Sequence, residues 1–225
     1  MFRTAGVDIH IRYDHTIVIE WQEKIPEEIH TRSTYDYIES GTFIILGALV
    51  SREYLDIEHA CIQDLTAFLL KCQEIGVRYE VRDHDTIRVF NSREYLKAIK
   101  VQTNIFPGFP TDLQSPFAIL MTQAEGISRI HEILFEWRLN WLIEIEKMKW
   151  HVAILNPHEA MIFWPIALRG ATVSSWDLRA GVAMIIAGML ARGRTSITNV
   201  EYIERGYEDI LGKLRKLGAI IEREE

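Results

Sequence analysis

The sequence Phe109-Pro110-Thr111-Asp112-Leu113-Gln114 stands immediately before an apolar segment that runs from 115 to 124. Apolar residues recur in this segment at helical spacing, and the polar residues before it are typical of a helix start. Trp176-Asp177-Leu178-Arg179 stands in the same relation to an apolar segment from 179 to 191. Two similar polar clusters, each followed by an apolar helix, indicate an internal repeat.

The repeat has a period of about 70 residues, because Gly126 lies 73 residues after Glu53 and Gly193 lies 67 residues after Gly126. Each copy is expected to hold an apolar helix, a short strand, an amphipathic helix and a further strand. The predicted helices are 41–50, 64–75, 115–124, 137–149, 179–191 and 204–217. The predicted strands contain Ile57, Ile130 and Ile197 or span 16–20, 77–81, 86–90, 152–155, 160–164 and 219–223.

The copies cover approximately 16–90, 91–164 and 165–225, and residues 1–15 are expected to complete the last copy within a single domain, 1–225. Residues 5–12 read like a helix end that runs into a strand, as do the stretches around Gly76 and Gly218. We therefore expect the chain to begin where a helix of a longer parent sequence would finish. Generic alternation of helices and strands is the alternative, although it does not account for the recurring polar cluster.

Composition narrows the classes of partner. The net charge is −7 over 225 residues, so broad attraction to nucleic acid or to an anionic membrane is disfavoured. The longest apolar runs are too short to span a bilayer, and no signal peptide is expected at Met1. Cys61 and Cys72 lie in apolar sequence, which is typical of reduced thiols in a cytoplasmic protein. The histidines show no metal-site spacing, so neither a metal nor a cofactor is expected.

Five motifs together resemble the enolpyruvyl transferases, and most closely the UDP-N-acetylglucosamine 1-carboxyvinyltransferases. They are Ile38-Glu39-Ser40-Gly41-Thr42-Phe43, Phe109-Pro110-Thr111-Asp112-Leu113-Gln114, Phe135-Glu136-Trp137-Arg138, Trp176-Asp177-Leu178-Arg179-Ala180-Gly181 and Ile203-Glu204-Arg205-Gly206-Tyr207-Glu208. The resemblance implies two similar domains, each an inside-out α/β prism of three βαβαββ units with helices inside and sheets outside. This chain is similar to the C-terminal half and the closing strands of the N-terminal half.

The resemblance also implies roles for five residues. Asp112 would accept the proton of the sugar 3-hydroxyl that attacks phosphoenolpyruvate, and the backbone near Leu134 would touch UDP-N-acetylglucosamine. Arg138, Arg179 and Arg205 would bind the enolpyruvyl and phosphate groups. These residue types suit that chemistry, because a carboxylate acts as a general base and guanidiniums give forked bonds to anionic oxygens.

Each of these residues also has a structural interpretation. Asp112 and, more strongly, Asp177 are candidates for helix N-caps. Arg179 is open to interpretation as a solvated surface residue. Arg138 and Arg205 are expected in the first turns of their helices, where the helix dipole disfavours cations, so a structural role explains them less well.

The family's reactive cysteine lies in its N-terminal half, and neither Cys61 nor Cys72 matches it. Because one wall of a cleft cannot fix two reactants, we expect the isolated chain to be nearly inactive. A separate N-terminal chain or self-association would complete the cleft. The alternative class is a non-catalytic scaffold or a binding and oligomerisation module. Tyr37 stands where the family usually has an arginine.

Four tryptophans depart from the resemblance. Trp137 stands beside Arg138, where a small or polar residue is expected, and Trp150 aligns with glycines that would be left-handed caps. Trp21 and Trp164 end corresponding strands. Either these rings cover surface that another domain would bury, or they pack in the core.

Overall fold

The computed structural model describes residues 3, 5–14, 16–20, 27–164 and 167–224, which form two compact units, Met1–Tyr35 and Asp36–Glu225. In the first unit, β1 (Ile9–Ile11) and β2 (Ile17–Ile19) form an antiparallel hairpin in which Ile9 pairs with Ile19. The strand expected at 16–20 is therefore present. The assignment of residues 1–15 to the last repeat stays a prediction, and Trp21 lies outside the described residues.

Three apolar helices form the centre of the second unit: α1 (Tyr37–Val50), α3 (Gln114–Thr122) and α5 (Leu178–Leu190). They contact one another, and most of their side chains are buried. Asp36 and Asp177 cap α1 and α5, because each carboxylate accepts hydrogen bonds from two backbone N–H groups of the first turn. The three predicted apolar helices and the N-cap interpretation of Asp177 are confirmed.

Sheets surround these helices. One sheet has the order β3-β5-β4, with β3 (Tyr54–Ile57), β4 (Tyr79–Val81) and β5 (Ile87–Phe90) all antiparallel. A second has the order β6-β7-β9-β8 and consists of β6 (Lys100–Gln102), β7 (Ile127–His131), β8 (Val152–Asn156) and β9 (Glu159–Phe163). Strands β10 (Thr172–Ser174) and β11 (Ser196–Thr198) form a parallel pair.

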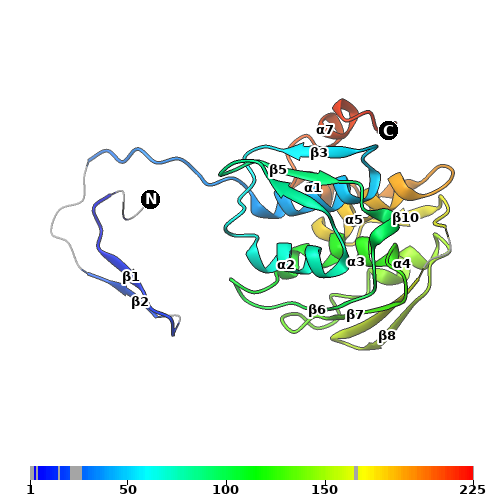
Figure 1. Cartoon of the computed structure of the whole chain (residues 1–225), viewed down its shortest axis with the longest axis horizontal. Helices are drawn as coiled ribbons and strands as arrows, with labels where there is room; N and C mark the ends of the chain where they lie inside the picture. Colours follow the sequence, from blue (N-terminus) through cyan, green and yellow to red (C-terminus); the bar gives the residue numbers. More distant parts are fainter. Residues whose placement is uncertain (1–2, 4, 15, 21–26, 165–166, 225) are drawn as a thin grey trace. The chain divides into compact units, whose positions relative to one another are not determined.

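The helices lie inside and the sheets outside. In Figure 1 the β3-β5-β4 sheet and the β6-β7-β9-β8 sheet lie on opposite sides of α1, α3 and α5. Helix α1 packs on β3 and β5, α3 packs on β9, and α5 packs on β11. Strand β6 is parallel to β7, whereas β7, β9 and β8 pair antiparallel. The predicted inside-out α/β architecture is confirmed.

The peripheral helices are shorter than predicted. Helix α2 (Thr66–Ile75) fills most of its expected range, but the helix predicted at 137–149 is reduced to α4 (Leu142–Glu146). Trp137 has a left-handed φ of 61° and cannot start a right-handed helix, and the residues on both sides of α4 make i→i−3 hydrogen bonds, such as Asn140 N–H to the Trp137 carbonyl and Lys149 N–H to the Glu146 carbonyl. The prediction at 204–217 is also wrong, because Asp209 has a φ of 44° and separates α6 (Glu201–Glu204) from α7 (Ile210–Lys216).

The strand predicted at 219–223 is wrong as well. Among the described residues this segment pairs with no strand, and Ile220 is fully exposed. A strand needs a neighbour to satisfy its backbone groups, and within the described part of Asp36–Glu225 no strand pairs with this segment. The short 3-10 helices η1 (Arg93–Tyr95) and η2 (Thr111–Leu113) complete the described elements.

The ends of the amphipathic helices explain part of the tryptophan pattern. Gly76 caps α2 with a left-handed φ of 104°, and Gly218 is left-handed at 91°. In the middle copy Lys149 takes the left-handed conformation, so the strain expected at Trp150 does not arise. Trp150 is buried and its Nε1 donates to the Phe163 carbonyl, whereas Trp137 and Trp164 are largely exposed. The core-packing interpretation therefore applies to Trp150 alone of these three.

Candidate functional site

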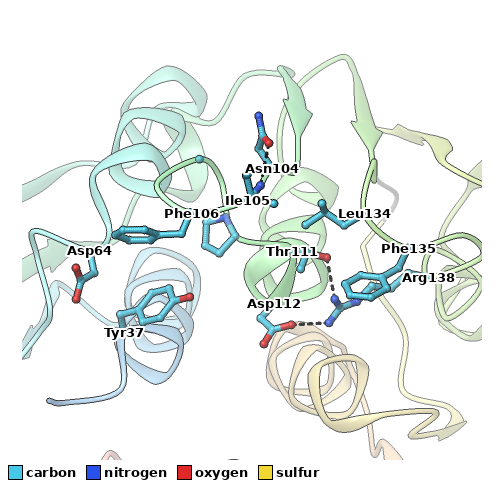
Figure 2. Close-up of a pocket in the computed structure, with 12 residues that line it drawn as sticks. Tyr37, Asp64, Asn104, Ile105, Phe106, Thr111, Asp112, Leu134, Phe135 and Arg138 are labelled. Atoms are coloured by element: carbon cyan, nitrogen blue, oxygen red, sulfur yellow. Dashed lines mark hydrogen bonds and ion pairs between the residues drawn. The ribbon is translucent and has the colours of Figure 1, made fainter. Parts of the chain in front are cut away.

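A cavity of about 270 Å³ opens at one end of the central helices. Figure 2 shows its lining side chains, which come from the start of α1, the loop before η2, η2 itself and the segment after β7. The lining residues are Tyr37, Asp64, Asn104, Ile105, Phe106, Gly108, Pro110, Thr111, Asp112, Leu134, Phe135 and Arg138. Asp112, Leu134 and Arg138 thus share one cavity, although they are up to 26 residues apart.

The central helices all begin at this place. Tyr37 is the first residue of α1, Asp112 lies in η2 immediately before α3, and Arg179 is the second residue of α5. Leu113 anchors η2 because it is fully buried against Gly41 of α1, where a Cβ would lie 2.5 Å from Leu113 Cδ1. Each helix start brings a positive partial charge, and α3 also has no side-chain cap, whereas Asp36 and Asp177 accept N–H groups of α1 and α5.

Two guanidiniums hold the Asp112 carboxylate. Arg138 Nη2 donates to Asp112 Oδ1 at 2.7 Å, and Arg179 Nη2 donates to Asp112 Oδ2 at 3.1 Å. Burial by itself would raise the pKa of Asp112, but the hydrogen bond from Arg138 and the charge of Arg179 outweigh it, so the pKa lies below its ordinary value. Asp112 makes no capping bond to η2 or α3, so the N-cap interpretation of this residue is wrong.

Arg179 is largely buried, so the interpretation as a solvated surface residue is also wrong. Its Nη1 is buried and has no hydrogen-bond partner among the described residues. Its guanidinium lies over the ring of Tyr207, whose hydroxyl is 2.9 Å from Thr42 Oγ1. Burial raises the pKa of the Tyr207 phenol, which keeps this neighbour neutral.

Arg205 is the predicted site residue that the structure does not bring into this ion-pair cluster. It is exposed, it follows the last residue of α6, and its guanidinium lies over the ring of Tyr202. The expectation that Arg138 and Arg205 lie in first helical turns is wrong. Arg138 lies in the turn four residues before α4, and Arg205 is at the C-terminal end of α6, where the dipole favours a cation.

Sequence reasoning missed Glu132. This residue is fully buried, and its carboxylate accepts hydrogen bonds from Thr103, Thr111 and the backbone of Leu134. Alternation along β7 turns Ser128 and Ile130 inward, and the same alternation carried one step past the strand places Glu132 inward. This alternation in the sequence could have indicated that Glu132 is buried.

Two further properties concern metals and membranes. Among the described residues, Asp83, His84 and Asp85 form the group whose possible metal-ligand atoms all lie within 4.8 Å of one another, in the turn between β4 and β5 and away from the cavity. This group is mostly exposed, and exposed acidic groups commonly bind no ion. Within the same described residues, no helix combines the length and the apolar character that crossing a membrane requires.

Comparison with known families gives a match over most of the chain. The profile of the EPSP synthase (3-phosphoshikimate 1-carboxyvinyltransferase) family matches residues 1–214. The UDP-N-acetylglucosamine 1-carboxyvinyltransferase of Streptococcus pneumoniae serotype 2 is 41% identical over 221 residues, which are 98% of this chain and 52% of that protein. UDP-N-acetylglucosamine 1-carboxyvinyltransferase 2 of Bacillus cereus is 40% identical over 190 residues, 84% of this chain and 43% of that protein.

Solved structures agree with this match. The enolpyruvyl transferase NikO from Streptomyces tendae has a TM-score of 0.87 and 28% identity, covering 98% of this chain and 52% of that one. EPSP synthase from Acinetobacter baumannii has a TM-score of 0.64 at 15% identity, covering 84% and 44%, and shows the fold alone. The chain spans about half the length of the curated relatives it matches.

Proposed function

This chain belongs to the EPSP synthase family of enolpyruvyl transferases, and from that premise we propose that it is the C-terminal half of a UDP-N-acetylglucosamine enolpyruvyl transferase. The reaction would transfer the enolpyruvyl group of phosphoenolpyruvate to the sugar 3-hydroxyl, in the cytoplasm, for peptidoglycan precursors. The observation that carries the proposal is the cluster of Arg138, Asp112 and Arg179 where three helices begin.

The cluster suits a substrate that brings both an anion and a proton to be removed. Within the ion-pair cluster two guanidiniums face the Asp112 carboxylate, and the uncapped start of α3 adds to their attraction for phosphate, whereas Asp64 also lines the cavity and opposes it. Arg205 would bind the same anion from the rim, and the backbone at Leu134 would face the sugar nucleotide.

Asp112 would change its basicity when the anion binds. In the unliganded chain its two arginine partners lower its pKa, so the carboxylate is ionised at neutral pH but is a weak base. Phosphate and carboxylate oxygens of phosphoenolpyruvate would compete for Arg138 and Arg179. Asp112 would then lose its partners, its pKa would rise, and it would accept the proton of the sugar hydroxyl as the new C–O bond forms and phosphate leaves.

The chain would supply one wall of the active site. A second wall, from a separate N-terminal chain or through self-association, would have to fix both reactants at near-contact distance. We therefore expect the isolated chain to bind weakly and to turn over little, and mixing with the other half to restore phosphate release from phosphoenolpyruvate and UDP-N-acetylglucosamine.

Phosphate release in the reconstituted mixture tests the catalytic role. Asp112→Asn is expected to abolish release because the amide cannot accept the proton, while Asp8→Asn, an exposed aspartate of the first unit, serves as the matched control. Unchanged release in Asp112→Asn would remove this residue from the mechanism.

Calorimetric titration of the chain alone tests the binding role. UDP-N-acetylglucosamine with phosphoenolpyruvate should give weak heats that decrease in Arg205→Ala, whereas Arg194→Ala, another exposed arginine, should leave them unchanged. An absence of heat at millimolar ligand would favour the non-catalytic scaffold instead.

A further inference from the structure

A buried carboxylate lies behind the cavity, at the end of β7. Glu132 has no solvent-exposed surface. Placing a carboxylate away from water is costly unless hydrogen bonds replace the lost hydration. An apolar residue at a buried, purely structural position would give equal or greater stability. The hydrogen bonds of this buried acid beside the candidate site therefore indicate what it does.

Three donors converge on this carboxylate. Thr103 Oγ1 donates to Oε1 at 2.8 Å, the Leu134 N–H donates to the same oxygen at 3.0 Å, and Thr111 Oγ1 donates to Oε2 at 2.6 Å. The Thr103 oxygen is itself occupied, because the Ile133 N–H donates to it at 3.1 Å. Since a carboxylate only accepts, the hydroxyl hydrogen of Thr111 must point toward Glu132.

The direction of that one hydroxyl fixes the next contact. A threonine hydroxyl has one hydrogen, so once it is given to Glu132 only oxygen lone pairs remain for other partners. Arg138 Nη1 donates to these lone pairs at 2.8 Å, and Nη2 of the same guanidinium donates to Asp112 Oδ1 at 2.7 Å. Figure 2 shows Arg138 linked in this way to both Thr111 and Asp112.

We propose that Glu132 is a positioning residue of the site: through the Thr111 hydroxyl it holds Arg138 against Asp112, and through the Leu134 N–H it fixes the backbone that faces the sugar nucleotide. The proposal rests on the proposed function only for the roles of Asp112 and Leu134. The hydrogen-bond relay from Glu132 to Asp112 is defined by the folded chain alone.

Other charged or titratable groups face the two ends of this relay. His158, from the turn between β8 and β9, has its Nδ1 2.6 Å from the carbonyl oxygen of Glu132. Asp112 is also faced by Arg179 from α5 and by the Tyr37 phenol from α1. None of these groups donates to the Glu132 carboxylate in the described residues, so the Thr111 hydroxyl and the Leu134 N–H are its links to the site.

Glu132→Gln tests the relay, because it keeps the shape but introduces an amide N–H₂ group. If that group faces Thr111, the hydroxyl can no longer donate to it; if it faces the other way, it meets the Leu134 N–H, which cannot accept, and the side chain must shift, so either orientation disturbs the contact with Thr111. The readout is the titration of the Asp112 carboxyl carbon by NMR, with the resonance identified by its loss in Asp112→Asn. We expect Asp112 to titrate at a higher pH than in the parent chain, since Arg138 is held less firmly.

The sign of the shift separates this proposal from simple electrostatics. Removing the negative charge of Glu132 would by itself lower the pKa of Asp112, whereas loosening Arg138 raises it. Thr111→Val removes the hydroxyl without changing charge and is expected to shift the titration upward too, while Thr111→Ser keeps the hydroxyl and should restore the parent midpoint.

Glu144→Gln is the matched control. Glu144 is another nearly buried glutamate, and it pairs with Lys147 and the backbone of Ser174 away from the cavity. Its variant should lose stability without moving the Asp112 titration. An unchanged or lowered midpoint in both Glu132→Gln and Thr111→Val would overturn the proposal.

The titration needs neither ligand nor turnover, so its outcome is independent of the function proposed above. A raised midpoint together with an absence of ligand heat would support the relay and contradict the enzyme assignment. Restored phosphate release together with an unchanged midpoint would support the enzyme assignment and contradict the relay.

Discussion

Gly41→Ala is expected to destabilise the chain because α1 and η2 approach each other too closely for a side chain. An added Cβ would lie 2.5 Å from Leu113 Cδ1 and 2.8 Å from Cδ2, whereas carbon atoms in contact prefer about 3.5–4.0 Å. Leu113 is fully buried, so it has no free space to enter. Overpacking costs about 1–3 kcal/mol, while alanine gains about 1 kcal/mol over glycine within a helix. The free energy of unfolding should therefore fall by about 1 kcal/mol.

Thermal unfolding measures this effect. A loss of about 1 kcal/mol corresponds to a Tm lower by about 2–4 °C in a chain of this size. Gly188→Ala in α5 is the matched control, because it brings the same helix-propensity gain while its Cβ would lie 3.3 Å from the nearest atoms of Thr195. That variant should be as stable as the parent or more so. A Tm of Gly41→Ala equal to or above that of Gly188→Ala would refute the packing argument.

A double-mutant cycle locates the clash. Leu113→Ala alone should cost about 2–5 kcal/mol, as buried leucines do. In the Gly41→Ala background the same change should cost less, because the new methyl group occupies part of the space left by Leu113. Additive effects would mean that the two residues do not compete for this space.

Three further predictions concern titration, backbone conformation and thiol burial. Because the pKa of Asp112 is lowered in the folded chain, its ion pairs stabilise the fold fully above the unfolded-state pKa of about 4, and this contribution is lost as pH falls through the folded-state value. The free energy of unfolding, measured in urea, should therefore decline less steeply from neutral to acidic pH in Asp112→Asn than in the parent chain. An identical decline would contradict the assignment. Trp137→Asn should raise the free energy of unfolding by up to about 1 kcal/mol in chemical denaturation, because asparagine tolerates the left-handed φ and the Trp137 side chain is 55% exposed. A less stable variant would show that the indole ring contributes to packing. Burial raises the pKa of both thiols, but Cys72 is fully buried and Cys61 is not. A thiol reagent should therefore modify Cys61 first and Cys72 only on unfolding, as followed by mass spectrometry. Rapid labelling of both cysteines in the folded chain would contradict the burial of Cys72.

The central helices were predictable from sequence because their apolar side chains must be buried in the core. A segment such as 178–190 has no polar face, so it must be surrounded by other elements on every side. The strands containing Ile57 and Ile130 followed from the alternation of apolar and polar residues. Burial patterns are local properties of the sequence, and they predicted these elements correctly, although not the strand expected at 219–223.

The peripheral helices were not predictable because single backbone angles interrupt them. Trp137 takes its left-handed conformation with its N–H bonded to the carbonyl of Pro157, a residue twenty positions away. Asp209 uses its side chain to cap α7 from a left-handed position. Such choices depend on tertiary contacts, and local propensity is too weak to indicate them.

The site was found in part. Resemblance led to Asp112, Arg138 and Arg179, and the structure brings these three together, while their catalytic and binding roles stay proposals. Arg205 was expected at the same place but lies outside the ion-pair cluster, and Glu132 was missed. Alternation along β7 indicates that Glu132 points inward, but it does not indicate which polar groups Glu132 contacts, so the hydrogen-bond relay is seen only in the folded chain.

The starts of α1, α3 and α5 lie close together beside the cavity, and this has a consequence for dynamics. These helices form the most deeply buried part of the molecule, and such segments open only when the whole domain unfolds. Amide protons along the first turns of α1 and α5, which Asp36 and Asp177 hold, should therefore exchange with solvent far more slowly than those of the exposed C-terminal segment. The helix starts therefore form a fixed wall of the cavity, so closure around an anion must come from its loop residues or from another polypeptide moving onto it.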